Sequence, residues 1–269
     1  MSSKADQNAR RAAPDRLSMP SVFTWVILIT FLALFIQGAM QAEVTLERLA
    51  RGSVNLVDFL GDAVPPDISR LDIIMIAMWE TLNMAIVGVT LGVILSLPFA
   101  LLSARNTTPH PIVRFFTRTL VSIFRTVPDL VWALIFVVAV GLGPLAGIMA
   151  IIMDTIGFCA RFFSERIEEI RPGPSEAIAS AGGGKGSMII GAILPESMAS
   201  LTATSLFSVE KAIRSAVVLG LVGAGGIGVE LSTSMRMFRY DQALTIIIVI
   251  LVVVIAVEQV SSAIRKRVM

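Results

Sequence analysis

The sequence predicts an all-α integral membrane protein with about six membrane-spanning helices. Of its 269 residues, 55% are hydrophobic and only 16% are charged, and the mean hydropathy is +0.81. These values are typical of membrane proteins rather than of soluble domains. The apolar residues also gather in runs of about 20, the length that a helix needs to cross the hydrocarbon core of a bilayer. The formal net charge of +2 is too small to indicate nucleic-acid binding.

Six segments fit a membrane-spanning helix on this length criterion. In chain order they are residues 21–40, 73–102, 127–140, 147–163, 194 to about 222, and 244–260. The third and fourth are separated only by residues 141–144, Gly-Leu-Gly-Pro, a composition that favours a tight turn. The fifth is interrupted by three charged residues, Glu210, Lys211 and Arg214.

The distribution of cations predicts the orientation in the membrane. Basic residues precede the first span, follow the second and fourth, and end the chain: Lys4, Arg10, Arg11, Arg16, Arg105, Arg114, Arg118, Arg161, Arg166, Arg171, Lys185, Arg265, Lys266 and Arg267. With six spans they all lie on one side, so the positive-inside rule predicts that both termini are cytoplasmic. The acidic segment 41–70 is then outside. The first span is too long for a removable signal peptide and lacks a small-residue cleavage site, so a permanent helix is expected.

A polar, glycine-rich insert at residues 171–195 lies between two of the spans. The Pro-Gly-Pro sequence at 172–174 ends the preceding helix. Ser175 is expected to cap a new short helix, with Glu176 in its first turn, where a negative charge is favourable. Three glycines at 182–184 then end this helix or allow another backbone to approach closely. An ordinary capped surface helix would also fit this pattern.

The insert resembles the EAA loop of the membrane subunits of ATP-binding-cassette (ABC) importers. The residues that match at the family's spacing are Glu176, Ala177, Gly182, Leu194 and Pro195, and the conservative departures are Ile178 and Ala192. The resemblance implies that this loop forms a short helix that docks into an ATPase subunit and transmits its closure.

Other strings resemble the permeases of phosphonate importers, a branch that includes phosphite and phosphate relatives. They lie at residues 125–130, 141–147, 154–157, 168–174 and 218–228, and the resemblance spans about 73–260. It implies a methionine-importer-like helical fold, a homodimer of the permease, two cytoplasmic ATPase subunits that hold ATP and Mg²⁺, and an extracytoplasmic binding protein. No cofactor is expected in this chain, which would lie in the bacterial inner membrane and do no covalent chemistry.

The expected organisation has four parts. Residues 1–20 form a cytoplasmic arm, and 21–71 hold the first membrane helix and an extracytoplasmic loop. Residues 72–263 form the permease domain with its coupling loop at 171–195, and 264–269 form a basic cytoplasmic tail.

Residues 223–228, Gly-Ala-Gly-Gly-Ile-Gly, match the G-x-G-x-x-G pattern literally. A dinucleotide site would need a βαβ unit around this pattern, and the flanking sequence provides none. Two interpretations remain: helix packing through small residues, or an irregular backbone at a substrate pathway, formed by Gly223, Gly225, Gly226 and Gly228. The glycine-rich stretch 182–187 lacks the Ser or Thr that must follow Lys185 in a Walker A loop, so any ATP would bind another polypeptide.

Charged residues inside the spans are candidates for the substrate pathway. Arg214 lies about 28 Å along a helix that begins at Pro195, close to the expected outer mouth. It could meet an oxyanion while Glu210 competes for it, or the two could form only a structural pair four residues apart. Arg125, Asp129 and Asp154 are further candidates. Asp154 is expected to pair with a hydroxyl or with a cation on another helix.

Two other function classes remain open at this point. An ion-coupled secondary transporter of a small anion would use the buried carboxylates as a proton relay. An integral membrane enzyme would need a catalytic cluster, and the chain has one histidine, His110, one cysteine, Cys159, and no HExxH pattern. A metal site is therefore not expected, and a disulfide within one chain is impossible.

Overall fold

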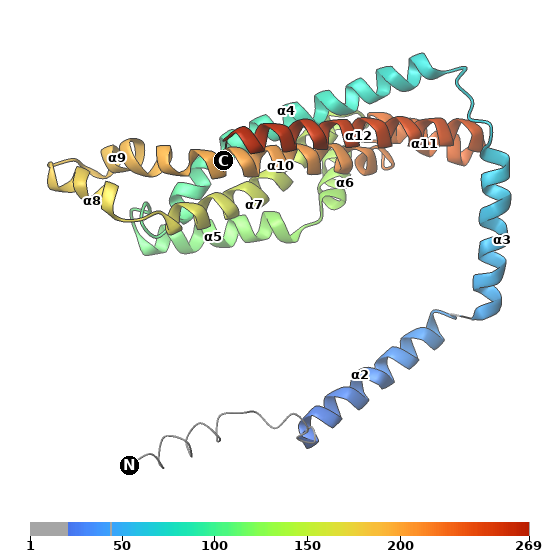
Figure 1. Cartoon of the computed structure of the whole chain (residues 1–269), viewed down its shortest axis with the longest axis horizontal. Helices are drawn as coiled ribbons and strands as arrows, with labels where there is room; N and C mark the ends of the chain where they lie inside the picture. Colours follow the sequence, from blue (N-terminus) through green and yellow to red (C-terminus); the bar gives the residue numbers. More distant parts are fainter. Residues whose placement is uncertain (1–20, 44, 269) are drawn as a thin grey trace, which may run out of the picture. The chain divides into compact units, whose positions relative to one another are not determined.

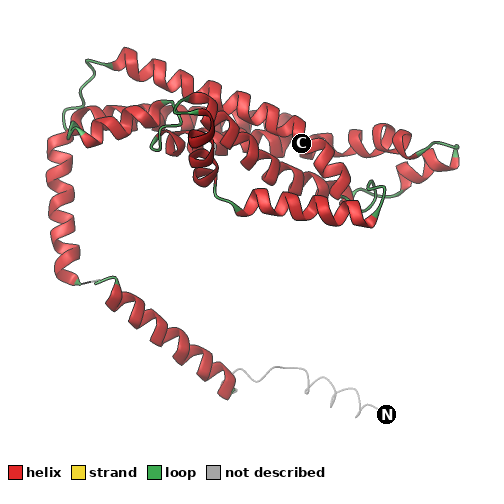
Figure 2. Cartoon of the chain, turned by 180° about the vertical axis from the view of Figure 1, so that it is seen from behind, coloured by secondary structure: helices red, strands yellow, loops and turns green. Residues whose placement is uncertain are grey.

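The computed structural model describes residues 21–43 and 45–268, which form helices joined by short turns (Figures 1 and 2). The predicted arm at 1–20 lies outside the described residues. The chain divides into two compact units, Met1–Phe59 and Leu60–Met269, and the boundary falls within one helix.

The first unit contains one helix that the sequence predicted and most of a second helix that it did not predict. Helix α2 (Val22–Gln41) corresponds to the first predicted span and is capped by Ser21, whose hydroxyl accepts the Thr24 N–H at 3.3 Å. Helix α3 (Leu46–Ala63) occupies most of the segment expected to be an outer loop. Its apolar residues recur at helical spacing, for example at Leu46, Leu49 and Leu56, with charged residues between them.

Four long helices form most of the second unit. They are α4 (Leu71–Ser103), α7 (Pro144–Glu169), α10 (Leu194–Gly220) and α12 (Tyr240–Val268). The most extensive packing joins α4 to α7. Two glycines on α4 allow it: a Cβ at Gly88 would lie 2.7 Å from the Ile151 side chain, and one at Gly92 would lie 2.6 Å from Thr155. Small residues four apart let two helix backbones approach closely.

The prediction that residues 127–140 cross the membrane as one helix is wrong. Helix α6 (Asp129–Val140) has 12 residues, or about 18 Å, whereas the hydrocarbon core is about 30 Å thick. It follows α5 (Pro111–Thr126) at a bend of 89°, because Pro128 cannot continue the preceding helix. Among the described residues, five helices are long and apolar enough to span, or six with this bent pair counted once. The prediction of about six spans is therefore confirmed, with a different third one.

The second unit has two distinct ends. At the coupling end lie α8 (Gly173–Ser180), α9 (Lys185–Met188) and a π-helical turn η1 (Ile189–Ile193) that leads into α10 (Figure 1). At the far end lie the α6–α7 turn and α11 (Ile227–Arg236), which follows the glycine run. Gly143 of the α6–α7 turn donates its N–H to the carbonyl of Gly223 at 3.0 Å. The bent α5–α6 pair thus leads the chain to the far end.

A polar contact joins the segment before α4 to the start of α12 at the far end. The Asp67 carboxylate accepts the side-chain amide of Gln242 at 2.9 Å and the backbone N–H of Ser69 at 2.8 Å. The Gln242 hydrogen bond, followed by those from Ser69, lowers the pKa of Asp67 from 3.8 to about 2. Thr245 also donates to the Asp67 carbonyl at 2.8 Å.

Candidate coupling site and transport pathway

The loop at the coupling end folds as a short exposed knuckle made of α8 and α9. Helix α8 begins at Gly173 with Pro172 as its N-cap, so the predicted cap at Ser175 is wrong. The Ser175 hydroxyl instead donates to the Pro172 carbonyl at 2.7 Å from inside the first turn. Glu176 lies in that first turn, as predicted, where the helix dipole favours its charge.

The glycines after α8 close the helix with a Schellman motif. Gly182 has φ +86°, its N–H bonds to the Ala179 carbonyl at 3.0 Å, and the Gly183 N–H bonds to the Ile178 carbonyl at 2.9 Å. A Cβ on Gly183 would lie 2.5 Å from the Ile178 side chain, whereas nothing lies within 4 Å of one on Gly182. Within this chain the requirement at Gly182 is therefore conformational, and the space beside it is free for another molecule.

The residues predicted to couple to an ATPase lie mostly at the surface. Glu176, Ala177, Gly182 and Pro195 are exposed, and Leu194 is half-buried. No residue of α8 is buried. Pro195 occupies the first turn of α10, where its missing N–H costs little. The docking role of these five residues stays a prediction.

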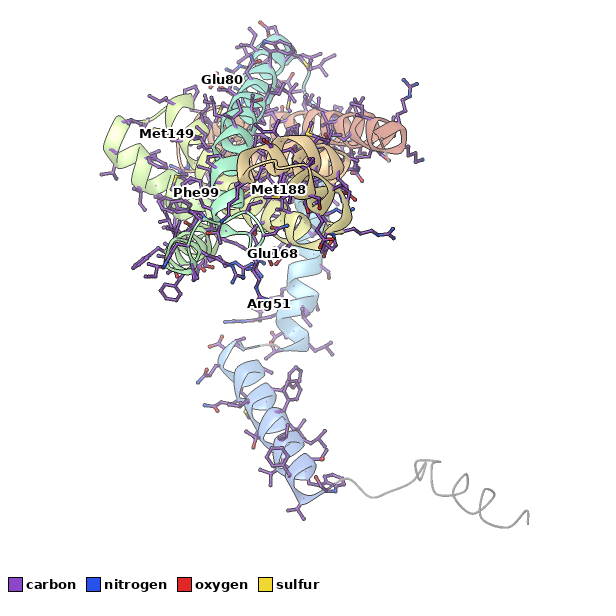
Figure 3. The ribbon with its side chains drawn as sticks, turned by 90° about the vertical axis from the view of Figure 1, so that its left-hand side faces the viewer. Arg51, Glu80, Phe99, Met149, Glu168 and Met188 are labelled. Atoms are coloured by element: carbon purple, nitrogen blue, oxygen red, sulfur yellow. The ribbon has the colours of Figure 1, made fainter. Side chains whose placement is uncertain are left out.

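The base of the knuckle is held by a carboxylate that sequence reasoning did not single out. Glu168, near the end of α7 (Figure 3), accepts the Arg105 backbone N–H at 2.7 Å and the guanidinium groups of Arg118 at 3.0 Å and Arg114 at 3.4 Å. Both arginines also donate through Nε to the Ser103 carbonyl at 3.1 Å. This network ties α4, α5 and α7 together beside the knuckle. From the sequence alone, these arginines predicted only the orientation of the chain in the membrane.

Asp154 pairs with a cation on another helix, one of the two partners predicted for it. The Lys211 ammonium group of α10 lies 2.7 and 2.8 Å from the two Asp154 carboxylate oxygens. The same ammonium lies 5.2 Å from the centre of the Phe158 ring, a cation–π geometry. Two charged residues inside the spans therefore neutralise each other between α7 and α10.

The predicted pairing of Glu210 with Arg214 is wrong. Oε1 of Glu210 lies 2.7 Å from Nη1 of Arg265 on α12, although the angle is not that of a hydrogen bond. The Glu210 side chain is only 6% exposed, while Arg214 is exposed and forms no ion pair with a described carboxylate. Helix α12 packs against α10 and supplies the nearer cation, which the spacing along α10 alone could not reveal.

The glycine run is an irregular turn, as one of the two interpretations required. Gly223, Gly225 and Gly226 have φ values of +88°, +87° and +72°, which favour glycine. The N–H of Gly226 donates to Oε1 of Glu80 at 3.0 Å. Thus Glu80 of α4 holds this turn in place.

The end of the run also packs closely, as the other interpretation required. A Cβ on Gly228 would lie 2.0 Å from the Val217 carbonyl oxygen and 2.8 Å from the Gly220 Cα. The N–H of Ile227 donates to the Thr81 hydroxyl at 2.8 Å, so α4 also caps the start of α11. The two interpretations are therefore compatible, and the pathway role of the glycines stays a prediction.

Arg125 and Asp129 lie on either side of the α5–α6 bend. Asp129 accepts the N–H of Leu130 at 2.9 Å, and Arg125 is exposed. No ion pair joins them in the described part of the chain. A Cβ on Gly157 of α7 would lie 2.7 Å from the Arg125 backbone nitrogen, so α7 contacts this bend directly. Their pathway role also stays a prediction.

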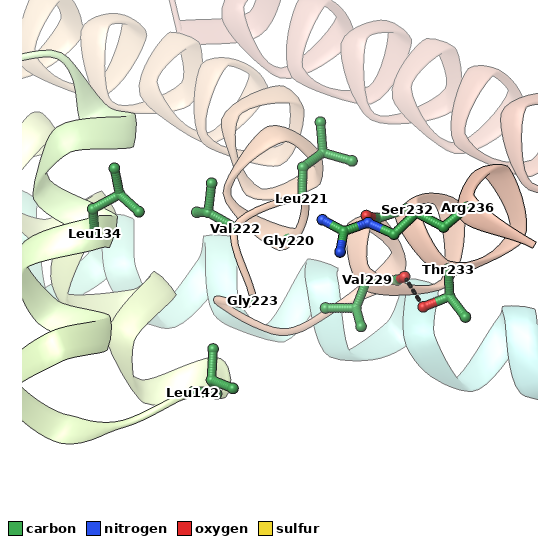
Figure 4. A pocket seen from close by; sticks show the side chains of 10 residues that line it. All are labelled: Leu134, Leu142, Gly220, Leu221, Val222, Gly223, Val229, Ser232, Thr233 and Arg236. Carbon is green, nitrogen blue, oxygen red and sulfur yellow. Dashed lines mark hydrogen bonds between the residues drawn. The ribbon is translucent and has the colours of Figure 1, made fainter.

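A cavity of about 450 Å³ opens at the far end between α6, the α6–α7 turn, the end of α10 and α11 (Figure 4). Its lining combines apolar side chains such as Leu134 and Leu142 with Ser232, Thr233 and Arg236. Sequence reasoning missed Arg236. The available signal was its position in a segment that the positive-inside rule assigns to the outside, where arginine is less common.

Residues 92–269 match the family described as the binding-protein-dependent transport system inner membrane component. The chain belongs to this family. It is 41% identical over 207 residues to the phosphate-import permease protein PhnE of Mycolicibacterium smegmatis, covering 77% of this chain but 39% of that protein. It is 35% identical over 238 residues to the phosphite transport system permease protein PtxC of Stutzerimonas stutzeri, covering 88% of this chain and 85% of that one.

A solved structure shares the fold of this family member. The inward-facing MetNI methionine ABC transporter matches with a TM-score of 0.65 at 21% identity, covering 76% of this chain and 99% of the matched chain. The expected all-α, methionine-importer-like fold is confirmed. The chain is thus a multi-pass membrane subunit of the ABC permease class.

Proposed function

We propose that this chain is the permease subunit of an ABC importer for phosphonate or a related phosphorus oxyanion. The observation that carries the proposal is the exposed knuckle at Glu176, Ala177 and Gly182, which projects from a bundle with the fold of an ABC permease. An extracytoplasmic binding protein delivers the substrate. ATP and Mg²⁺ bind two separate ATPase subunits, and this chain does no covalent chemistry.

The knuckle provides a mechanical connection from the ATPase to the membrane helices. Closure of the ATPases on ATP moves α8 and α9, and the movement reaches α10 through Leu194 and Pro195. It reaches α4 and α5 through Glu168, which bonds to Arg105 and Arg118 beside the knuckle. ATP binding then opens the far end, and hydrolysis returns the permease to the inward-facing state.

The substrate class rests on the relatives and on the exposed arginines. The similar proteins are named for phosphate import and phosphite transport. Arg125, Arg214 and Arg236 are exposed and form no ion pair with a described carboxylate. A guanidinium group binds tetrahedral oxyanions through two parallel hydrogen bonds, so these side chains suit an anionic phosphorus compound.

The ion pairs weigh against the alternative of a secondary transporter. A proton relay needs carboxylates that can gain and lose a proton during transport. Asp154 is paired with Lys211 and Glu210 with Arg265, so each of these carboxylates already has a cation as its partner. The distribution of basic residues supports the orientation that we propose, in which both termini lie in the cytoplasm of a bacterium and the far end of the second unit faces outside.

Reconstitution of the complete complex tests this function. The permease, its ATPase and its binding protein are purified and placed in vesicles, and uptake of radiolabelled 2-aminoethylphosphonate, phosphite and phosphate is measured. We expect uptake of at least one of them that requires ATP and the binding protein and that survives an uncoupler. Uptake that stops with the uncoupler at constant ATP would overturn the proposal in favour of ion coupling.

A further inference from the structure

The far-end cavity has the composition of an anion-binding site. We propose that it binds a tetrahedral phosphorus oxyanion through Arg236 and receives the substrate before it enters the membrane. This inference rests on the proposed function and assigns a place to its substrate. The cavity volume of about 450 Å³ lies in the range of small-molecule sites.

Three polar side chains of α11 form one side of the cavity. Ser232 and Arg236 are four residues apart and therefore share a face of the helix. Figure 4 shows the Arg236 guanidinium beside the Ser232 hydroxyl and directed toward Leu221 at the end of α10. Thr233 donates to the Val229 carbonyl at 2.8 Å, which leaves its oxygen free to accept a hydrogen bond from a protonated oxyanion.

Arg236 differs from two other arginines at this end. Arg70 lies 3.9 Å from Glu230, and Arg239 interacts electrostatically with Asp67. No described carboxylate lies within ion-pair distance of Arg236. A cation without a counter-charge in a cleft with apolar walls attracts anions, because the walls focus its field.

The opposite side of the cavity is apolar. Leu134 of α6, Leu142 of the α6–α7 turn and Val222 lie there. An organic phosphonate has both an oxyanion and an apolar or weakly polar substituent, so it matches both sides. Phosphite and phosphate match only the cationic side. The geometry therefore favours tighter binding of an organic phosphonate than of either inorganic anion.

A second candidate arginine, Arg214, lies on α10, the helix whose end borders the cavity. Leu221 lines it, and Arg214 lies seven residues earlier on the same face of α10. The rise between them is about 10 Å. An oxyanion that leaves Arg236 would therefore next meet Arg214 along this face.

Protection from a thiol reagent tests binding in the cavity without a transport assay. The native Cys159 is fully buried, so a cysteine introduced as Val229→Cys, which lines the cavity, is the reactive one. We expect methylphosphonate to slow its labelling by a membrane-impermeant reagent in the assembled complex. The matched control Met237→Cys, exposed but outside the lining, should show no protection. Adding Arg236→Gln should abolish the protection of Val229→Cys, and adding Arg239→Gln should leave it.

Transport separates this inference from the proposed function. We expect Arg236→Gln to lower ATP-driven uptake at limiting substrate by roughly 10- to 100-fold, as for the loss of a charge-assisted hydrogen bond. Arg236→Lys should restore part of it, and Arg239→Gln should stay near wild type. If the wild type shows no ATP-driven uptake, the proposed function fails. If the wild type imports, Arg236→Gln imports equally well and methylphosphonate gives no protection, only the cavity proposal fails.

Discussion

At the scale of residues, the charges inside the helices are made tolerable by partners on other helices. An isolated charge within a membrane span is costly. Lys211 neutralises Asp154 across α7 and α10, and Arg265 neutralises Glu210 across α10 and α12. This explains why α10 continues through a segment in which charged residues interrupt the apolar run. The sequence revealed the charged residues, but their partners lie 57 and 55 positions away and depend on helix packing.

The corrected partner of Glu210 leads to a charge-swap prediction. Glu210→Gln leaves Arg265 without its carboxylate, and we expect the complex to lose about 1–3 kcal/mol of stability, since Arg265 remains partly exposed. The double variant Glu210→Arg with Arg265→Glu should recover part of this loss. Thermal unfolding of the purified complex measures both.

The matched control exchanges the residue that was first expected to be the partner. Glu210→Arg with Arg214→Glu should be no more stable than Glu210→Arg alone, because Arg265 would then face an arginine. Recovery by this second swap, without recovery by the Arg265 swap, would show that Glu210 pairs with Arg214 in the membrane.

At the scale of elements, apolar length predicted the long helices well. Helices α4, α7 and α12 each contain the predicted span and extend beyond it by a few residues, and α2 is shifted from its predicted span by one residue. The bend between α5 and α6 was missed, because hydropathy does not register that Pro128 interrupts a helix. Helix α3 was missed because its charged residues conceal an amphipathic period. The coupling loop was predictable because proline, glycine and a first-turn glutamate all act locally.

The left-handed backbone conformation of Gly182, at the end of α8, permits a specific test of this residue. Its φ of +86° costs an ordinary L-residue roughly 1–2 kcal/mol, whereas asparagine tolerates this conformation better. Gly182→Asn should therefore keep α8 intact while adding a side chain to the open space beside the turn. If the ATPase docks there, we expect ATP hydrolysis to continue with little uptake.

The control for this experiment is Gly183→Ala, whose Cβ would meet the Ile178 side chain within the knuckle itself. We expect it to weaken association of the ATPase by distorting α8. Wild-type uptake by Gly182→Asn would show that the glycine is required only for its backbone conformation and that docking lies elsewhere.

At the scale of the whole molecule, the second unit connects two distant sites by continuous helices. Glu168 and the knuckle lie at one end, and Arg236 and the glycine turn lie at the other. Helix α10 begins beside the knuckle and ends at the cavity. Sequence motifs located the first site, since its residues are consecutive. The second draws on α6, α10 and α11, so only the folded chain brings its residues together.

A homodimer with two-fold symmetry is the remaining prediction at this scale, because one set of about six spans supplies half of a symmetric pathway. The glycine run is expected near the axis, but Gly225, Gly226 and Gly228 are buried within their own chain and cannot report a contact between copies. Leu221, beside the run and 42% exposed, is the better probe. We expect Leu221→Cys to cross-link two permease copies in the active complex. The buried Cys159 should stay unreactive, and Phe115→Cys on α5 should give far less cross-linking. An active complex that contains a single permease copy would rule the dimer out.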